Sequence, residues 1–139
     1  MSNQKDNWLH KHFMVERDFE AEHAVHQTYH EISPHYHEFY ELYFFISGNA
    51  DYVVGNARYL LEPGDMIFVP PDLIHSPALR DFESQYERCV VWVTNGLMNY
   101  LFRMDADLTL FSLKNKENIY LYRSGEDGIR RYQPLFDTI

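Results

Sequence analysis

The sequence is divided into short stretches of apolar, aromatic and β-branched residues, each followed closely by residues that favour turns. The clearest turn is Gly55-Asn56, a pair that lies between two such stretches and is typical of a two-residue β-hairpin. Turns at this spacing leave little room for long helices and favour a sandwich or barrel of about eight strands. We expect strands over residues 13–19, 24–30, 39–46, 51–54, 58–61, 66–69, 74–79 and 86–93.

Apolar residues at helical spacing occur only late in the chain. Asn95 is the expected N-cap of a short helix, and residues 118–123 are expected to form one more strand. Ser124 is the expected start of a second helix, with Asp127 at the capping-box position. The apolar pattern of this helix is still running at Ile139, so we expect the protein to continue beyond it. The apolar face consists of Ile129, Tyr132, Leu135 and Phe136.

The chain has 139 residues, which is the usual size of one domain. Its 12 basic and 21 acidic residues give a formal net charge of −9, which argues against direct binding of nucleic acid by this chain. The single cysteine, Cys89, excludes an internal disulfide and fits a reducing compartment. No apolar stretch approaches the ~20 residues of a membrane helix, and residues 1–11 contain no secretory signal. We therefore expect a cytoplasmic protein that does not enter a membrane.

Eight histidines are many for a chain of this length. A lone His-x-His pair carries little information at this composition. Here, however, His35 and His37 are followed by Glu41 after three residues and by Gly48 after six more. Residues 63–75 then contain Pro-Gly-Asp, a further proline and a histidine. Together the two stretches resemble the two motifs of the cupin superfamily, whose fold is a small double-stranded β-helix, or jelly-roll barrel.

The resemblance implies a metal site, because the matching cupin positions are metal ligands. In this sequence those positions are His35, His37, Glu41 and His75, so all four are present. Three neutral imidazoles and one carboxylate suit a divalent transition metal such as zinc, iron, nickel or manganese. An extended chain from His37 to Glu41 would span about 13 Å, too far for both to reach one ion. The site therefore requires the chain to bend at residues 38–40.

Three positions depart from the cupin motifs. Tyr29 and Asp72 stand where the motifs have glycine, and Leu79 stands where the second motif has asparagine. These departures weaken the resemblance to cupin enzymes more than the resemblance to the fold. The alternative to a metal site is a wet pocket whose histidines and glutamate hydrogen-bond one another or a sugar. The remaining histidines match no motif and are expected on the surface or on strand faces: His10, His12, His23, His26 and His30.

Three stretches, residues 37–48, 59–70 and 86–93, narrow the resemblance further. They resemble the N-terminal sensor domain of AraC-type transcriptional regulators. That family implies a cupin barrel that binds a small-molecule effector, often a sugar, followed by a helical segment that promotes dimerisation. It also implies a DNA-binding domain with two helix-turn-helix units. We expect contact with DNA only through that domain, beyond residue 139.

The expected fold is therefore mainly β, a cupin double-stranded β-helix with one or two C-terminal helices. Residues 1–12 are polar and are expected to form an N-terminal arm. Residues 13–123 would form the cupin barrel. Residues 124–139 would form the start of a C-terminal helix for dimerisation or linkage.

The effector pocket is expected along two strands. The candidate ligand-binding residues are Tyr43, Tyr86, Arg88 and Trp92. The first shares a strand face with Glu41, and the other three share one face of the later strand. An interior arginine needs a partner, which a sugar hydroxyl or a carboxylate would provide, and the indole offers a stacking face. The alternative is that the aromatic residues are ordinary core and that Arg88 pairs with Glu41 or Glu62.

Two classes of function fit these patterns. The first is a non-enzymatic, dimeric sensor domain of an AraC-type regulator that binds a small, carbohydrate-like effector. The second is a stand-alone metal-dependent cupin enzyme, such as a dioxygenase or an isomerase, which the complete set of ligand residues favours. A third possibility combines features of both classes: a regulator domain that retains a metal for structure or for sensing.

Overall fold

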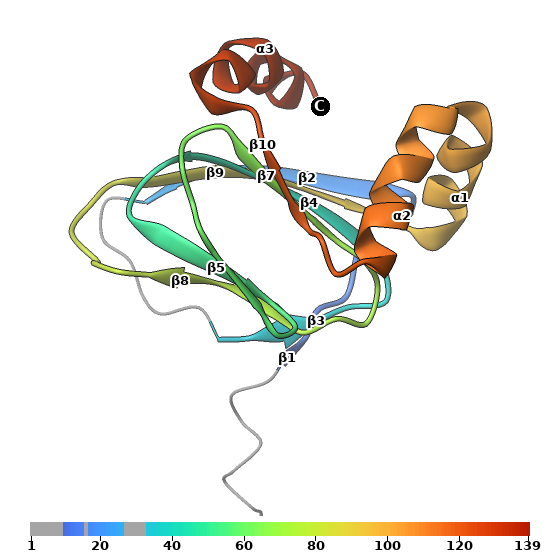
Figure 1. Cartoon of the computed structure of the whole chain (residues 1–139), viewed down its shortest axis with the longest axis horizontal. Coiled ribbons are helices and arrows are strands. Elements are labelled where there is room, and N and C mark those ends of the chain that lie inside the picture. The colour runs from blue at the N-terminus through green and yellow to red at the C-terminus, as the bar shows by residue number, and fades with distance from the viewer. Residues whose placement is uncertain (1–9, 16, 27–32) are drawn as a thin grey trace, which may run out of the picture.

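The computed structural model describes residues 10–15, 17–26 and 33–139, and β-strands form much of it (Figure 1). The strands are β1 (His10–Lys11), β2 (Phe19–His26), β3 (His35–Tyr36), β4 (Tyr40–Ser47), β5 (Ala50–Val54), β6 (Ala57–Leu60), β7 (Asp65–Val69), β8 (His75–Leu79), β9 (Tyr86–Val93) and β10 (Leu121–Arg123). The helices are α1 (Asn95–Met104), the 3-10 helix η2 (Ala106–Leu108), α2 (Thr109–Lys116) and α3 (Gly125–Asp137).

The strands form two five-stranded sheets that face each other across the interior of the protein (Figure 1). One sheet has the order β1-β3-β8-β5-β6 and the other the order β10-β7-β4-β9-β2. The pairing of β1 with β3 is parallel, whereas β4 is antiparallel to both of its neighbours, β7 and β9. The mainly-β, two-layered fold that the turn spacing predicts is confirmed.

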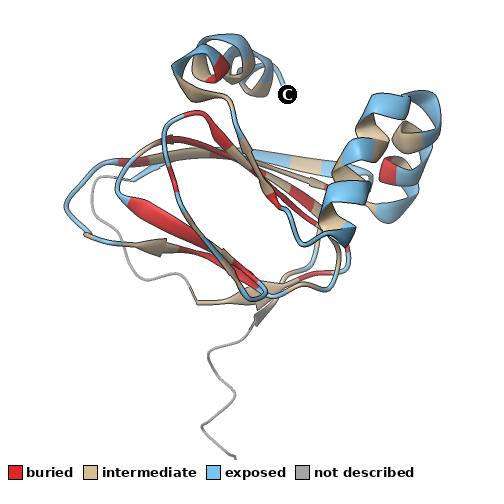
Figure 2. Ribbon diagram, viewed as in Figure 1, coloured by how far each residue is buried: buried red, intermediate tan, exposed pale blue. Residues whose placement is uncertain are grey.

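The space between the sheets is filled by alternate side chains of the strands. Tyr43 and Phe45 of β4 point into it, as do Tyr52 of β5 and Tyr86 of β9, and all four are buried. Figure 2 shows buried segments along the strands, while the helices are mostly exposed. Because side chains alternate along a strand, this interior face fixes which residues of β4 and β9 point outward.

The outward face of the β4 sheet is covered by the three α-helices (Figure 1). Phe44 of β4 stacks on Phe136 of α3, with ring centroids 5.1 Å apart, and Cys89 lies buried in the same cluster. Burial raises the pKa of the Cys89 thiol to about 11, with contributions from the carboxylates of Asp137 and Glu87. Helices α1 and α2 pack beside the same sheet over a separate cluster centred on Phe68.

The hairpin expected at Gly55-Asn56 is present between β5 and β6, with Val54 opposite Ala57. Gly55 has a φ of +55°, which suits the left-handed conformation such a turn needs. The strand expected over residues 118–123 is shorter than predicted, since β10 begins only at Leu121.

The strand expected over residues 13–19 is wrong. The described residues between His12 and Asp18 lie outside any strand, and β2 begins at Phe19. Phe13 is 68% exposed and Val15 is 92% exposed, so the alternating pattern here faces no apolar layer. β2 ends at His26, and the rest of the strand expected over residues 24–30 lies outside the described residues.

The helix caps also differ from expectation. Thr94, not Asn95, caps α1, because its Oγ1 accepts a hydrogen bond from the backbone N–H of Leu97 at 3.3 Å. Ser124 precedes α3 but donates its hydroxyl to the carbonyl of Gly64 at 2.6 Å instead of capping the helix. Helix α2 follows Leu108 without a side-chain cap, and the sequence patterns did not predict it. In the described part of the chain, none of the helices has the length and apolar character needed to span a membrane.

Gly64 provides a test of how α3 joins the barrel. Its φ is +93°, and a Cβ at this position would lie 2.0 Å from the carbonyl oxygen of Gly125. We expect Gly64→Ala to lower the free energy of unfolding by about 2 kcal/mol or more, measured by urea denaturation. The control is Gly96→Ala in α1, where nothing lies within 4 Å of the new Cβ, and where alanine should raise stability by about 0.5 kcal/mol. Equal effects of the two substitutions would contradict this packing.

Candidate functional site

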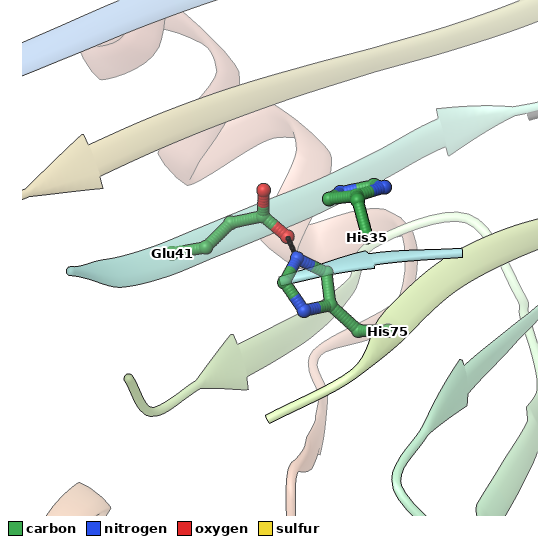
Figure 3. Close-up of side chains that lie close together, drawn as sticks. All are labelled: His35, Glu41 and His75. Carbon is green, nitrogen blue, oxygen red and sulfur yellow. Dashed lines mark ion pairs between the residues drawn. The ribbon is translucent and has the colours of Figure 1, made fainter. Parts of the chain in front are cut away.

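Polar side chains from three strands meet in the interior between the two sheets (Figure 3). His35 of β3 and His75 of β8 are register partners in one sheet, and Glu41 of β4 faces them from the other sheet. One potential ligand atom from each of the three lies within 4.8 Å of the other two. His37 completes the group, with Nε2 3.7 Å from Glu41 Oε1. The structure therefore brings together all four residues that the cupin motifs single out.

A bend in the chain makes this arrangement possible. β3 ends at Tyr36, residues 38 and 39 form a bend, and β4 begins at Tyr40 in the opposite sheet. The bend expected at residues 38–40 is therefore confirmed. It places His37 and Glu41 on facing walls, although only three residues separate them.

Asp72 supports the bend from the second motif. Its backbone N–H donates to the carbonyl of His37 at 2.7 Å, which joins the two motifs directly. Asp72 has a φ of +68°, in the left-handed region where the cupin motif has glycine. Because aspartate tolerates this region better than most residues, the departure from the motif preserves the local conformation.

Main-chain carbonyls orient the histidine rings. Nδ1 of His35, His37 and His75 lies 3.2, 2.8 and 2.7 Å from the carbonyl oxygens of Ser33, Phe39 and Leu73, respectively. A carbonyl oxygen only accepts hydrogen bonds, so each Nδ1 carries the proton. In a neutral ring Nε2 is then an acceptor. Metal-ligating histidines characteristically have a carbonyl or carboxylate partner on the second nitrogen.

Glu41 is 3% exposed, so its charge must be compensated inside the protein. Its carboxylate accepts hydrogen bonds from the Tyr52 hydroxyl at 2.6 Å and the Trp92 indole at 2.7 Å. Nε2 of His75 lies 3.3 Å from the carboxylate, but the geometry is not that of a hydrogen bond. The buried Nε2 atoms of His37 and His75 both lack a hydrogen-bond partner. The Nε2 atoms of His37 and His75 thus lie 3.7 and 3.3 Å from a buried carboxylate.

The pKa values show that the cluster favours positive charge beside Glu41. Burial by itself raises the pKa of Glu41, but the facing His75 and His37 hold it well below its usual range. Burial lowers the pKa of His75, yet the Glu41 charge raises it to a net value above the ordinary one. Burial and the neighbouring His75 lower the pKa of His35 to about 4. A divalent cation would supply the positive charge while leaving the imidazoles neutral.

His12 lies close to this cluster, which the sequence did not predict. β1 runs beside β3, and the N–H of His12 donates to the carbonyl of Tyr36 at 2.9 Å. The His12 ring is half-buried, with its centroid 4.9 Å from that of Trp92 and 5.8 Å from that of His37. Burial, followed by the effect of His37, lowers the pKa of His12. No local motif marks His12, because its position depends on strand pairing with a distant segment.

The other non-motif histidines lie away from the cluster. His23 and His26 are exposed on β2, as expected. The side chain of His10 and all of His30 lie outside the described part of the chain.

Two members of the cluster, His35 and Glu41, line a cavity of about 170 Å³. The four candidate ligand-binding residues, Tyr43, Tyr86, Arg88 and Trp92, all line this cavity. The sequence did not single out Tyr52, Pro77 or Glu22, which also line it. Tyr52 belongs to an expected strand, but alternation along one strand does not reveal which residue of another sheet it will face.

Arg88 is held at the cavity wall by neighbouring rings. Its guanidinium lies over the Tyr86 ring, 4.4 Å from the centroid, and donates a hydrogen bond to Nδ1 of His26. The hydroxyls of Tyr43 and Tyr86 are hydrogen-bonded to each other. Of the two carboxylates considered as partners of Arg88, Glu62 instead forms an ion pair with Arg123 at 3.4 Å. Aromatic, hydroxyl and cationic groups therefore share one wall.

A larger hollow of about 740 Å³ lies along β2, lined by residues 15 and 17–22 with Trp92 and Ile139. It is open to solvent and contains no member of the histidine–glutamate cluster. The smaller cavity is the better candidate site because converging polar groups, rather than volume, identify a binding site.

Residues 19–91, just over half of the chain, match the family described as the AraC-like ligand binding domain. The chain belongs to this family. The matched residues of the AraC-like domain include all four members of the cluster and three of the four candidate ligand-binding residues. Trp92 follows directly after them. A search of curated protein sequences finds no match.

Solved structures show the fold of the AraC-like domain. A Cupin 2 conserved barrel domain protein from Salinispora arenicola CNS-205 is 23% identical, with a TM-score of 0.50 over 66% of this chain and 76% of that one. AerE from Microcystis aeruginosa is 18% identical, with a TM-score of 0.51 over 56% of this chain and 37% of that one. These likenesses confirm the expected cupin barrel and carry no information on activity.

The Tyr52–Glu41 hydrogen bond gives a stability test of the AraC-like site. We expect Tyr52→Phe to lower the free energy of unfolding by about 1.5–3 kcal/mol, because a buried carboxylate loses a donor. The control is Tyr59→Phe on the paired strand β6. Tyr59 lies opposite Tyr52 and only accepts a 3.3 Å bond from the N–H of Tyr120. Urea unfolding should show a loss of under about 1 kcal/mol for the control. A smaller loss for Tyr52→Phe than for Tyr59→Phe would contradict the assignment.

Proposed function

We propose that this AraC-like domain senses a small, carbohydrate-like effector on behalf of a transcriptional regulator. The observation that carries the proposal is the cluster of nitrogen and oxygen ligands, of which His35 and Glu41 line the cavity. Buried polar atoms are costly without a partner, and Nε2 of His37 and Nε2 of His75 have no hydrogen-bond partner in the structure. Because they lie inside a domain of the AraC-like ligand-binding family, a role in ligand binding is the simplest explanation for them.

The proposed metal ligands are His35, His37, Glu41 and His75. Their donor set fits zinc, iron, nickel or manganese, and their Nδ1 atoms already have the carbonyl partners that fix ligating histidines. When bound, a divalent metal supplies Lewis acidity and an attachment point for oxygen atoms of a ligand. Tyr52 and Trp92 hold the carboxylate of Glu41 in place from two further strands.

The proposed effector contacts are Tyr43, Tyr86, Arg88 and Trp92. A cavity of about 170 Å³ is similar in size to the ~150 Å³ cavities that take a single six-membered ring. Tyrosine hydroxyls and a guanidinium suit the hydroxyl groups of a sugar, and the tryptophan ring suits its apolar face. A monosaccharide is therefore the effector class that fits the volume and the chemistry.

The regulatory role extends beyond the described cavity. We propose that α3 contributes to a homodimer and that the domain acts on DNA through a following DNA-binding domain, in the cytoplasm. Helix α3 packs on Phe44, three residues after Glu41 on the same strand, so a displacement of that strand would also reach the helix.

The second candidate function is a metal-dependent cupin enzyme, a dioxygenase or an isomerase. The complete set of four ligand residues favours it, because a sensor of sugars needs no redox or Lewis-acid chemistry. The two candidates differ in whether a bound sugar is recovered unchanged.

Metal binding tests the cluster. We expect the purified protein to bind about one equivalent of Zn²⁺, Ni²⁺ or Mn²⁺ per chain, measured by titration calorimetry and elemental analysis. His75→Ala should weaken binding by about tenfold or more. His26→Ala, which removes an exposed histidine, should leave it unchanged. Loss of metal in the His26 variant alone, or equal affinity in all three proteins, would contradict the proposed ligands.

Effector binding tests the cavity. Zn²⁺-loaded protein would be titrated with a panel of monosaccharides, and at least one should bind and raise the melting temperature. Arg88→Ala should weaken that binding by about tenfold, since a charge-assisted hydrogen bond is lost. Arg58→Ala, which removes an exposed arginine bound to Asp51, is the control. NMR spectra should show the sugar unchanged after prolonged incubation, whereas conversion to a product would establish the enzyme instead.

A further inference from the structure

A further cavity lies outside the barrel, between the outward face of the β4 sheet and the helices α1, η2 and α2. Figure 1 shows α1 and α2 beside this sheet. Its volume is about 200 Å³. Ten residues line it: Tyr40, Leu42, Phe68, Val91, Val93, Met98, Leu101, Phe102, Leu108 and Phe111. Nine of these side chains are aliphatic, aromatic or thioether, Tyr40 adds a phenol, and none of them carries a charge. The cavity therefore differs in chemistry from the polar one between the sheets.

The size and the lining of this cavity indicate the type of ligand. Protein interiors are close-packed, so an apolar space of this volume is unusual in a small domain. A comparable apolar cavity of ~150 Å³ remains free of water and binds benzene or xenon. Apart from the Tyr40 hydroxyl, the lining side chains offer water no hydrogen-bond partner, whereas a small apolar molecule gains van der Waals contacts with them.

Four of the ten lining side chains are aromatic, and their rings contact one another. The rings of Tyr40 and Phe68 have centroids 5.5 Å apart, and Phe68 lies 5.0 Å from Phe111. Tyr40 also meets Phe102 edge-to-face at 5.9 Å. Rings at these separations and angles offer both faces and edges to a further ring placed among them. An aromatic ligand consequently gains more here than an alkyl chain of the same volume.

The sheet separates this cavity from the polar one. Leu42 of β4 lines the apolar cavity, while the adjacent Glu41 and Tyr43 line the polar cavity. On β9, Val91 lines the apolar cavity and the adjacent Val90 lines the polar one. The two cavities therefore have no lining residue in common, although they use the same two strands.

We propose that the space between the β4 sheet and helices α1 and α2 is a binding site for a small, uncharged aromatic molecule of one or two rings. The site is distinct from the polar cavity and does not depend on the metal or effector assignments. Its occupant contacts the helices and the sheet together, and so stabilises their packing.

Benzene is the probe for the test. In the wild-type protein with labelled methyl groups, we expect saturable NMR shifts on adding benzene, largest at Leu42, Val91 and Leu101. Val91→Phe fills the cavity and should weaken benzene binding at least tenfold. The matched control is Val90→Phe, which places the same ring on the other side of the same strand and should leave benzene affinity within twofold.

The methyl shifts decide the outcome even when a variant fails to fold. Shifts that are absent, do not saturate or centre on Val90 would overturn the proposal, as would unchanged benzene affinity in folded Val91→Phe. Zn²⁺ titration of the same samples separates the two sites. Failure of metal binding with intact benzene binding would count against the metal centre alone.

Discussion

The buried charge of Glu41 is the constraint around which the barrel interior is built. A carboxylate that is almost fully buried destabilises a fold unless several donors meet it. Here the donors and facing imidazoles come from β5, β8 and β9 and from the segment after β3, so both sheets contribute. Compensation of this one charge thus links the two sheets, in addition to the apolar side chains packed between them.

Main-chain geometry prepares the histidines for their role. Each ring is oriented by a carbonyl two residues away along its own chain, so the orientation follows from local backbone conformation. The left-handed conformation of Asp72 and its bond to His37 link the local segments. Ligand directions set in this way need little rearrangement on binding, which favours affinity.

Local patterns predicted local features, and the failures have physical reasons. Motif spacing identified His35, His37, Glu41 and His75 as a group, and the reach of an extended chain predicted the bend before Glu41. The hairpin at Gly55 followed from turn chemistry. By contrast, His12 and Tyr52 reach the site through pairing with distant strands. Local patterns in a single sequence do not reveal which strands pair. The strand predicted near Phe13 is absent because the alternating apolar residues there have no apolar layer to pack against. Helix α2 begins without a capping side chain, so its start carried no signal.

Alternation along β4 has a consequence for how such a domain can evolve. Odd-numbered positions such as Glu41 and Tyr43 face the polar cavity, and even-numbered positions such as Leu42 and Phe44 face the helices. Substitutions that alter recognition can therefore accumulate on one register of the strand while the other register remains under separate selection. A lineage can therefore change the ligand it recognises without changing how its helices pack, because the two properties depend on alternate residues of the same strand.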